Sequence, residues 1–234
     1  MDIAFFGDSL TEGISGTSFL SILEKFLPGH TLHNYGRGGD TVISLYRRIR
    51  RLRPESRFDI SFLWIGVNDI LATQSRTYPL LKRLRRQPWA RSDTQFRHYY
   101  RKSLDQLSRH SGFVFSIPPL LIGEDLSGNW NKRLDHLAAI IEEICGSSDR
   151  ADFLDIRLDM FPLLPDNGGP GYVPKSAFRI LMENRPSRSF RGREEKKSGE
   201  KFFLTVDGIH LNDRGAQIVA DRFFCEIKKI FGSG

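Results

Sequence analysis

The sequence has few cysteines and no long apolar run. Its 234 residues include only two cysteines, Cys145 and Cys225, and neither has the spacing of a metal ligand or of a Cys-x-x-Cys motif. Both lie in segments with the pattern of amphipathic helices, so we expect two buried free thiols in a reducing compartment. No apolar run approaches the roughly 20 residues that cross a bilayer, which excludes a transmembrane helix.

The start of the sequence also has no signal-peptide pattern. The first predicted strand begins almost at Met1, which leaves no room for a basic region, an apolar region and a cleavage site. If Met1 is the native start, we expect a cytoplasmic protein.

Composition is that of a soluble globular protein, with 39% hydrophobic and 27% charged residues. The formal net charge is +7, and the basic residues gather at residues 47–53, 82–86 and 185–197. These runs have two interpretations, a solvated surface or a field that steers an anionic partner. Because none of them interleaves aromatic residues as nucleic-acid modules do, we expect no obligatory nucleic-acid partner.

Short apolar runs alternate with longer segments of helical period, the pattern of an α/β protein with a parallel sheet. Strands are predicted at residues 3–6, 31–35, 59–65, 112–117 and 152–156, the third being central and buried. Helices are predicted at residues 18–26, 41–52, 94–109 and 130–145. A last helix is predicted after the N-cap Asn212, with one apolar stripe made of Ala216, Val219, Phe223, Ile227 and Ile230.

Two segments are longer than the short connections expected between these strands and helices. We therefore predict one domain over residues 1–234 with elaborated loops at about 71–93 and 165–201. The first loop contains a short basic amphipathic helix at residues 78–86. The second contains a helix-like piece at 176–182 and a polar basic stretch at 185–200 that we expect to be mobile.

A serine stands in a tight turn directly after the first predicted strand. Residues 7–13 read Gly-Asp-Ser-Leu-Thr-Glu-Gly, and the carboxyl end of a parallel strand is where an α/β sheet presents its ligand-binding groups. Ser9 is therefore a candidate nucleophile, although the same residues also make ordinary turns. We expect Asp8 to be structural and to bond within this turn.

Polar or glycine-rich turns also follow the second and third predicted strands. Glycines at 36, 38 and 39 let backbone N–H groups approach a ligand, and the helix that follows favours developing negative charge. After the third strand, Asn68 places an amide at the same edge, either to donate to an oxyanion or to cap the next turn.

The last predicted helix is preceded by an aspartate and a histidine spaced three apart. Asp207 and His210 can face the same way on a bend, where the carboxylate bonds the imidazole and holds its tautomer. His210 is then a candidate general base. The other five histidines have no acidic residue at that spacing in a strand-end loop, so we expect surface or packing roles for them.

In this order the motifs resemble those of the SGNH hydrolase superfamily, the GDSL-type esterases and lipases. The four residues that name the family match Ser9, Gly39, Asn68 and His210, and Asp207 matches the third member of the triad. Gly39 is chosen because it precedes the start of a helix in the Gly-Asp-Thr pattern usual in the family.

The resemblance implies a flavodoxin-like three-layer α/β/α fold with strand order 2-1-3-4-5. It also implies hydrolysis of esters or thioesters through an acyl-enzyme, with no metal and no cofactor. The triad would be Ser9, His210 and Asp207, and the oxyanion hole would be the backbone N–H groups of Ser9 and Gly39 with the Asn68 side chain.

We therefore expect a serine ester hydrolase that acts on a small or medium-sized ester. The basic loops favour an anionic acyl donor, such as a phospholipid, an acyl-CoA or an acidic acetylated sugar. A rival hypothesis is a non-catalytic protein whose Leu80, Leu81 and Leu84 face, with its basic flanks, docks on an anionic membrane or nucleic acid.

Overall fold

A computed structural model describes residues 1–75, 77–165, 168–172 and 202–231. One parallel sheet with strand order β2-β1-β3-β4-β5 forms its centre, as predicted. The strands are β1 (Asp2–Gly7), β2 (Thr31–Gly36), β3 (Phe58–Trp64), β4 (Ser111–Ile117) and β5 (Ala151–Phe153).

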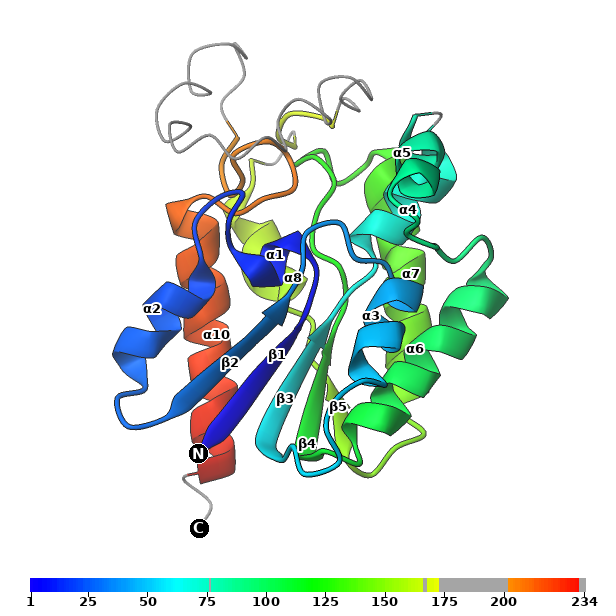
Figure 1. The fold of residues 1–234 in the computed structure, drawn as a ribbon. Helices are drawn as coiled ribbons and strands as arrows, with labels where there is room; N and C mark the ends of the chain where they lie inside the picture. Colours follow the sequence, from blue (N-terminus) through cyan, green and yellow to red (C-terminus); the bar gives the residue numbers. More distant parts are fainter. Residues whose placement is uncertain (76, 166–167, 173–201, 232–234) are drawn as a thin grey trace.

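Helices cover both faces of the sheet and make a three-layer α/β/α sandwich (Figure 1). One face is covered by α2 (Phe19–Phe26), α8 (Arg157–Met160) and α10 (Asp213–Phe231), and the other by α3 (Val42–Ile49), α6 (Asp93–Leu107) and α7 (Asn129–Cys145). The short elements are α1 (Ser9–Glu12), α4 (Val67–Gln74), α5 (Tyr78–Leu84) and the 3-10 turn η1 (Phe161–Leu163).

From Ile60 to Trp64 strand β3 is buried on both faces, which explains why this part of the strand is mostly apolar. Ile60, Phe62 and Trp64 pack on the α2 and α10 side, while Leu63 packs on the α3 and α6 side. A parallel strand between two helical layers has no solvated face and needs no polar alternation. The predicted central position of this strand is confirmed by its pairing with β1 and β4.

The fifth strand is shorter than predicted. The ladder ends at Phe153, although Leu154 and Ile156 are buried in the core on the α10 side. Their apolar side chains pack in the core beyond the end of the ladder. An apolar run in the sequence does not show whether its residues pair in a strand or only pack in the core.

Side chains cap the starts of several helices, and the predicted N-cap Asn212 is confirmed. The hydroxyl groups of Ser18, Thr41 and Ser92 accept backbone N–H groups at the starts of α2, α3 and α6. Asn212 likewise accepts the N–H of Gly215 at 3.0 Å at the start of α10.

Two predictions about the last helix and the cysteines are wrong. Ile230 is 38% exposed, whereas the other four members of the predicted stripe are buried. Cys145 is buried, but Cys225 is exposed. Cys225 lies two residues from both Phe223 and Ile227, so at about 100° per residue it points away from the apolar face.

The loop predicted at residues 71–93 begins inside α4 and contains α5, which confirms the short helix at this place. Leu80 and Leu84 are exposed, whereas Leu81 and Lys82 are buried. The three leucines therefore do not form one exposed face, as the docking hypothesis assumed. Of the loop predicted at 165–201, the helix-like piece and the basic stretch lie outside the described residues.

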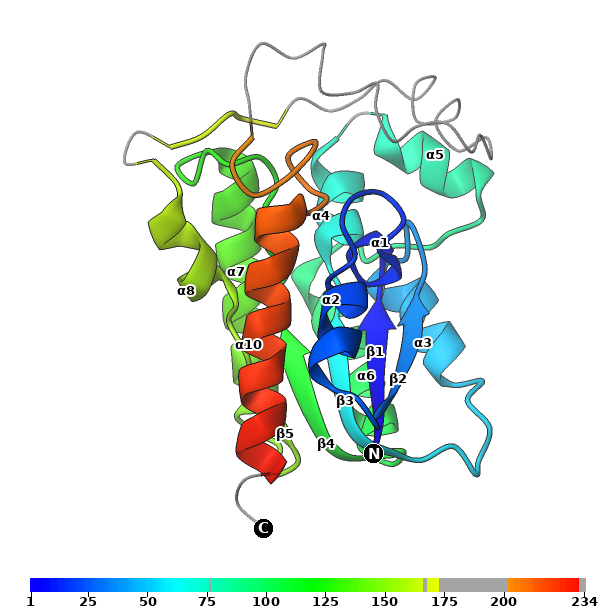
Figure 2. The same ribbon diagram turned by 90° about the vertical axis from the view of Figure 1, so that its left-hand side faces the viewer.

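The carboxyl ends of the strands gather the functional segments at one edge of the sheet. Figure 2 shows α1 and α5 at this edge, together with the loop that leads into α10. No helix in the described ranges is long and apolar enough to span a membrane.

Candidate active site

Ser9 is the first residue of the one-turn helix α1, directly after strand β1. A Cβ on Gly7 would lie 2.6 Å from the carbonyl oxygen of Trp64 and would also collide with Thr11, so only glycine fits here. Asp8 caps the turn, because its Oδ1 accepts the backbone N–H of Leu10 at 3.1 Å. The expected structural role of Asp8 is confirmed by this bond.

Ser9, His210 and Asp207 form one hydrogen-bonded chain. Ser9 Oγ lies 3.0 Å from His210 Nε2, and His210 Nδ1 lies 2.9 Å from Asp207 Oδ2. The other carboxylate oxygen, Asp207 Oδ1, accepts the backbone N–H groups of Ile209 at 3.1 Å and His210 at 2.9 Å. Since a carboxylate only accepts, His210 Nδ1 carries a proton and Nε2 is free to accept the Ser9 hydroxyl.

The loop before the Asp207-His210 pair is held by a buried carboxylate, Glu124, that no local sequence pattern indicated. Glu124 has no exposed surface, and its oxygens accept the backbone N–H groups of Phe203, Leu204 and Thr205 at 2.6 to 3.0 Å. The Thr205 hydroxyl donates to the same carboxylate at 2.9 Å. Glu124 therefore fixes the segment that leads to the Asp207-His210 pair from about 80 residues away in the sequence.

Asn68 is buried in the first turn of α4, beside the turn that holds Ser9. Its Nδ2 donates to Asp8 Oδ2 at 3.3 Å, and its Oδ1 accepts from Lys82 Nζ at 3.2 Å. Burial raises the pKa of Asp8 to about 6, although the Leu10 N–H, His210 and Asn68 all favour its charged form. Asn68 thus contacts the residue that precedes Ser9 rather than capping its own helix.

The glycine-rich turn after β2 packs closely on the turn that holds Ser9. The backbone N–H of Gly38 donates to Glu12 Oε2 at 2.8 Å, and a Cβ on Gly38 would lie 4.0 Å from Ser9 Cβ. Gly39 has a φ of 78°, a left-handed conformation that favours glycine. The glycine turn therefore lies within reach of a group bound at Ser9.

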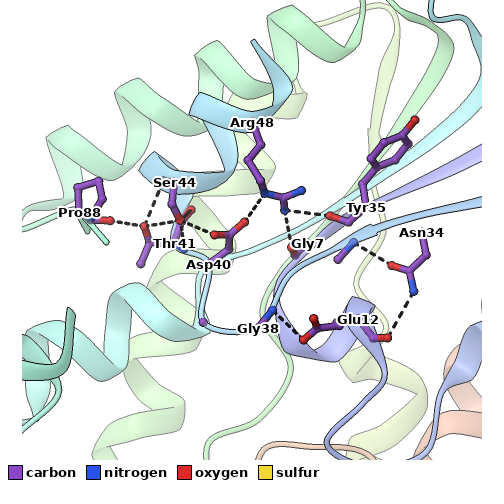
Figure 3. A network of polar contacts seen from close by, with 12 residues as sticks. Gly7, Glu12, Asn34, Tyr35, Gly38, Asp40, Thr41, Ser44, Arg48 and Pro88 are labelled. Atoms are coloured by element: carbon purple, nitrogen blue, oxygen red, sulfur yellow. Dashed lines mark hydrogen bonds and ion pairs between the residues drawn. The ribbon is translucent and has the colours of Figure 1, made fainter. Parts of the chain in front are cut away.

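An arginine ties these two turns together, as Figure 3 shows. Arg48 extends from α3 and donates to the carbonyl oxygens of Gly7 at 3.2 Å and Tyr35 at 2.9 Å. Its Nε donates to Asp40 Oδ2 at 2.6 Å, and Asp40 also accepts the Ser44 hydroxyl at 2.8 Å. This member of the basic run at residues 47–53 is thus a structural residue at the ends of β1 and β2.

Asp69 joins three segments around the site. Its two oxygens accept the backbone N–H groups of Val42 and Ala90, each at 2.8 Å. Burial raises the pKa of Asp69 to about 7, partly offset by these N–H groups and by the charge of Lys82. Asp69 thereby fixes α4, the start of α3 and the segment after α5.

Two other histidines also have aspartate partners, which local spacing did not reveal. His33 lies 2.7 Å from Asp2, and His136 lies 2.8 Å from Asp93. Both pairs are more exposed than the Asp207-His210 pair, and their aspartates are distant in sequence. Among the described residues, no cluster of histidine, cysteine and acidic side chains is arranged to hold a metal ion.

The fold and this edge of the sheet define a serine ester hydrolase of the SGNH class. The sequence as a whole gives the family: residues 5–218 match the GDSL-like lipase/acylhydrolase family, and the chain belongs to it. A search of curated protein sequences found no match.

Solved structures with the same fold include acetylxylan esterases. One acetyl xylan esterase has a TM-score of 0.68 and 22% identity, over 97% of this chain and 100% of the other. The acetylxylan esterase of Geobacillus stearothermophilus has a TM-score of 0.66 and 17% identity, over 97% of this chain and 93% of the other. Structures of that enzyme include catalytic mutants at a serine, a histidine and an aspartate.

Proposed function

We propose that Ser9, His210 and Asp207 are the catalytic triad of this ester hydrolase. The observation that carries the proposal is the continuous relay of 3.0 Å and 2.9 Å from the serine through the imidazole to the carboxylate. Ser9 Oγ attacks the acyl carbonyl carbon while its proton passes to His210 Nε2. The imidazolium then protonates the leaving alcohol, and an acyl-serine remains.

Water completes the reaction by the reverse sequence. His210 Nε2 takes a proton from the water as its oxygen attacks the acyl carbon, and the same proton returns to Ser9 Oγ when the acid leaves. Asp207 stabilises the imidazolium in both halves through its bond to Nδ1.

We further propose that the oxyanion is held by the backbone N–H groups of Ser9 and Gly39 and by Asn68 Nδ2. The close packing of the glycine turn on Ser9 and the contact of Asn68 with Asp8 support this assignment. Donors fixed before the reaction stabilise the developing charge without reorganisation, and each is worth roughly 3 kcal/mol.

For the substrate, we propose a short acyl ester on a saccharide, acetyl being the first candidate. Similarity over nearly the full length to esterases that act on acetylated xylan supports this class. Exposed Arg37 in the glycine turn and Arg85 after α5 lie around the site, so a saccharide that carries carboxylates would be favoured.

A panel of esters tests the substrate proposal. We expect a higher kcat/KM for 4-nitrophenyl acetate than for the octanoate, and release of acetate from acetylated xylooligosaccharides. Added salt should lower kcat/KM for acetylated oligosaccharides with uronic acids and leave neutral ones unchanged. Preference for the octanoate would contradict the short acyl group, and equal salt effects would contradict the anionic saccharide.

Two double variants separate the effect of positive charge near the site from the effect of the net charge of the protein. Arg37→Gln with Arg85→Gln should reduce kcat/KM for the anionic saccharide by several-fold. Arg51→Gln with Arg53→Gln changes the net charge equally, but these exposed residues follow the end of α3, which lies at the opposite edge of the sheet. We expect no change there, and equal losses in both pairs would contradict steering at the site.

A further inference from the structure

Lys82 is a buried lysine in a short helix that the sequence predicted to be a basic surface element. Only 4% of the residue is exposed, although its neighbours Arg83 and Leu84 on α5 are exposed. Burying an ammonium group costs free energy unless polar partners surround it. Its partners therefore show what the buried charge does.

The ammonium group contacts both proposed oxyanion-hole residues outside the triad. Lys82 Nζ donates to the carbonyl oxygen of Gly39 and, at 3.2 Å, to Oδ1 of Asn68. A third contact, at 3.5 Å, reaches Oε1 of Gln87. One cation thus joins the glycine turn after β2 to the first turn of α4.

The bond to Asn68 determines which way its carboxamide faces. An ammonium group can only donate, so the atom beside Lys82 is the oxygen Oδ1. The nitrogen Nδ2 then faces Asp8, whose Oδ2 accepts one of its two hydrogens at 3.3 Å. The second hydrogen of Nδ2 is the one that the proposed oxyanion role of Asn68 requires.

We propose that Lys82 is a positioning residue of the oxyanion hole: it holds the Asn68 carboxamide and the Gly39 peptide so that their N–H groups face the oxyanion. This inference rests on the proposed roles of Asn68 and Gly39. Lys82 itself does not touch the reacting atoms; it acts through these two residues.

The charged groups around Lys82 come from every segment that packs on it. Asp69 on α4, Asp8 before α1 and Asp40 after β2 favour the ammonium form, whereas Arg85 disfavours it. Burial outweighs the carboxylates and lowers the pKa of Lys82 to about 8. The positioning contacts therefore weaken when the pH rises through about 8, because the neutral amine loses one donor and its charge.

Three substitutions of Lys82 and one control test the proposal on a short neutral ester. Lys82→Met should lower kcat on the order of tenfold with little change in KM, a smaller loss than removal of an oxyanion donor. Lys82→Gln provides a second neutral variant, and Lys82→Arg keeps the charge. Arg83→Met on the exposed side of α5 should match wild type. Circular dichroism and thermal melting establish that each variant is folded.

A double-mutant cycle separates positioning from a structural role. If Lys82 acts through Asn68, the fold loss in kcat of the double variant Asn68→Ala with Lys82→Met should be much smaller than the product of the two single losses. Wild-type kcat should also fall as the pH rises through about 8, whereas the Lys82→Arg variant should not fall there.

The possible results distinguish this inference from the proposed function. A folded Lys82→Met variant with wild-type kcat, or losses that multiply in the cycle, would overturn the role of Lys82 while leaving the triad intact. A Ser9→Ala variant with wild-type kcat would instead overturn the proposed function itself.

Discussion

The Asp207-His210 pair differs in its surroundings from a second aspartate-histidine pair of similar length. Asp93 and His136 are 40% and 52% exposed, against 15% and 20% for Asp207 and His210. Arg133 hydrogen-bonds Asp93 and is the main cause that lowers its pKa. Asp207 accepts backbone N–H groups instead, so its second oxygen is aimed at one imidazole nitrogen.

Replacing Asp207 by asparagine should abolish most turnover without unfolding the protein. The Asn oxygen would accept the backbone N–H groups, so the amide NH₂ would face His210 Nδ1 and force the proton onto Nε2. We expect kcat for a short activated ester to fall by roughly 10³-fold or more.

The matched control for this substitution is His136→Ala, which removes the exposed pair. We expect its kcat to equal that of wild type. An Asp207→Asn variant that keeps kcat within tenfold of wild type would contradict the assigned role of Asp207.

Contacts between residues nearby in sequence were predictable from spacing, and the distant contact of Ser9 with His210 followed from the resemblance to the family, but other distant contacts gave no signal. The three-residue spacing of Asp207 and His210 indicated their contact directly. Lys82 looked like part of a basic run because its partner Asn68 belongs to another helix. Glu124 carried no local signal, since the three backbone N–H groups and the hydroxyl that donate to it lie about 80 residues later.

At the scale of elements, the loop before α10 is held by Glu124, which lies about 80 residues earlier in the sequence. Three backbone N–H groups and one hydroxyl converge on this carboxylate. Asn212 adds a bond from its amide to the carbonyl of Phe203 at 3.0 Å. The geometry of the proposed triad therefore depends on a contact between two loops.

Glu124→Ala should destabilise the protein and slow catalysis together. Three backbone N–H groups would lose their acceptor, which should lower the free energy of unfolding by about 3 kcal/mol or more. Urea denaturation measures this change. Glu124→Gln should lose less, because one oxygen still accepts several of these groups. Glu142→Ala, at an exposed position of α7, is the control and should change neither quantity. Equal stability of Glu124→Ala and wild type would contradict this role.

Element types were predictable where apolar periodicity and a capping residue agreed, as at Asn212 before α10. The end of β5 was not, because Leu154 and Ile156 are apolar for core packing rather than for ladder pairing. The segment predicted to be mobile at 185–200 lies outside the described residues and stays a prediction.

At the scale of the whole molecule, the parallel sheet brings residues about 200 apart in sequence to one place. Strand β1 pairs with β2 on one side and β3 on the other, so the chain reverses its direction of sheet growth at β1. Ligands of open α/β sheets bind at this kind of switch point, beyond the carboxyl ends of the strands. Ser9, Gly39 and Asn68 follow these three strands.

Two buried carboxyl groups should make the stability of the whole protein fall as the pH rises from about 4 to 7. Burial raises the pKa of Asp8 to about 6 and of Asp69 to about 7, from an ordinary value of 3.8. The folded protein then holds more protons than the unfolded chain in this window, so the free energy of unfolding decreases with pH.

Urea denaturation of wild type and Asp69→Asn across this window checks the sign. The stability of the variant relative to wild type should rise between pH 4 and 7, by up to about 4 kcal/mol. A constant difference between the two proteins across the window would show that Asp69 does not titrate there.

The most direct test of the account is covalent labelling of the nucleophile. A fluorophosphonate reacts with a serine that a neighbouring base has activated, so wild type should gain one adduct, mapped by peptide mass spectrometry to Ser9. Folded Ser9→Ala should gain none, and His210→Ala should react far more slowly. An adduct on another serine, or no adduct on folded wild type, would contradict the assignment of Ser9.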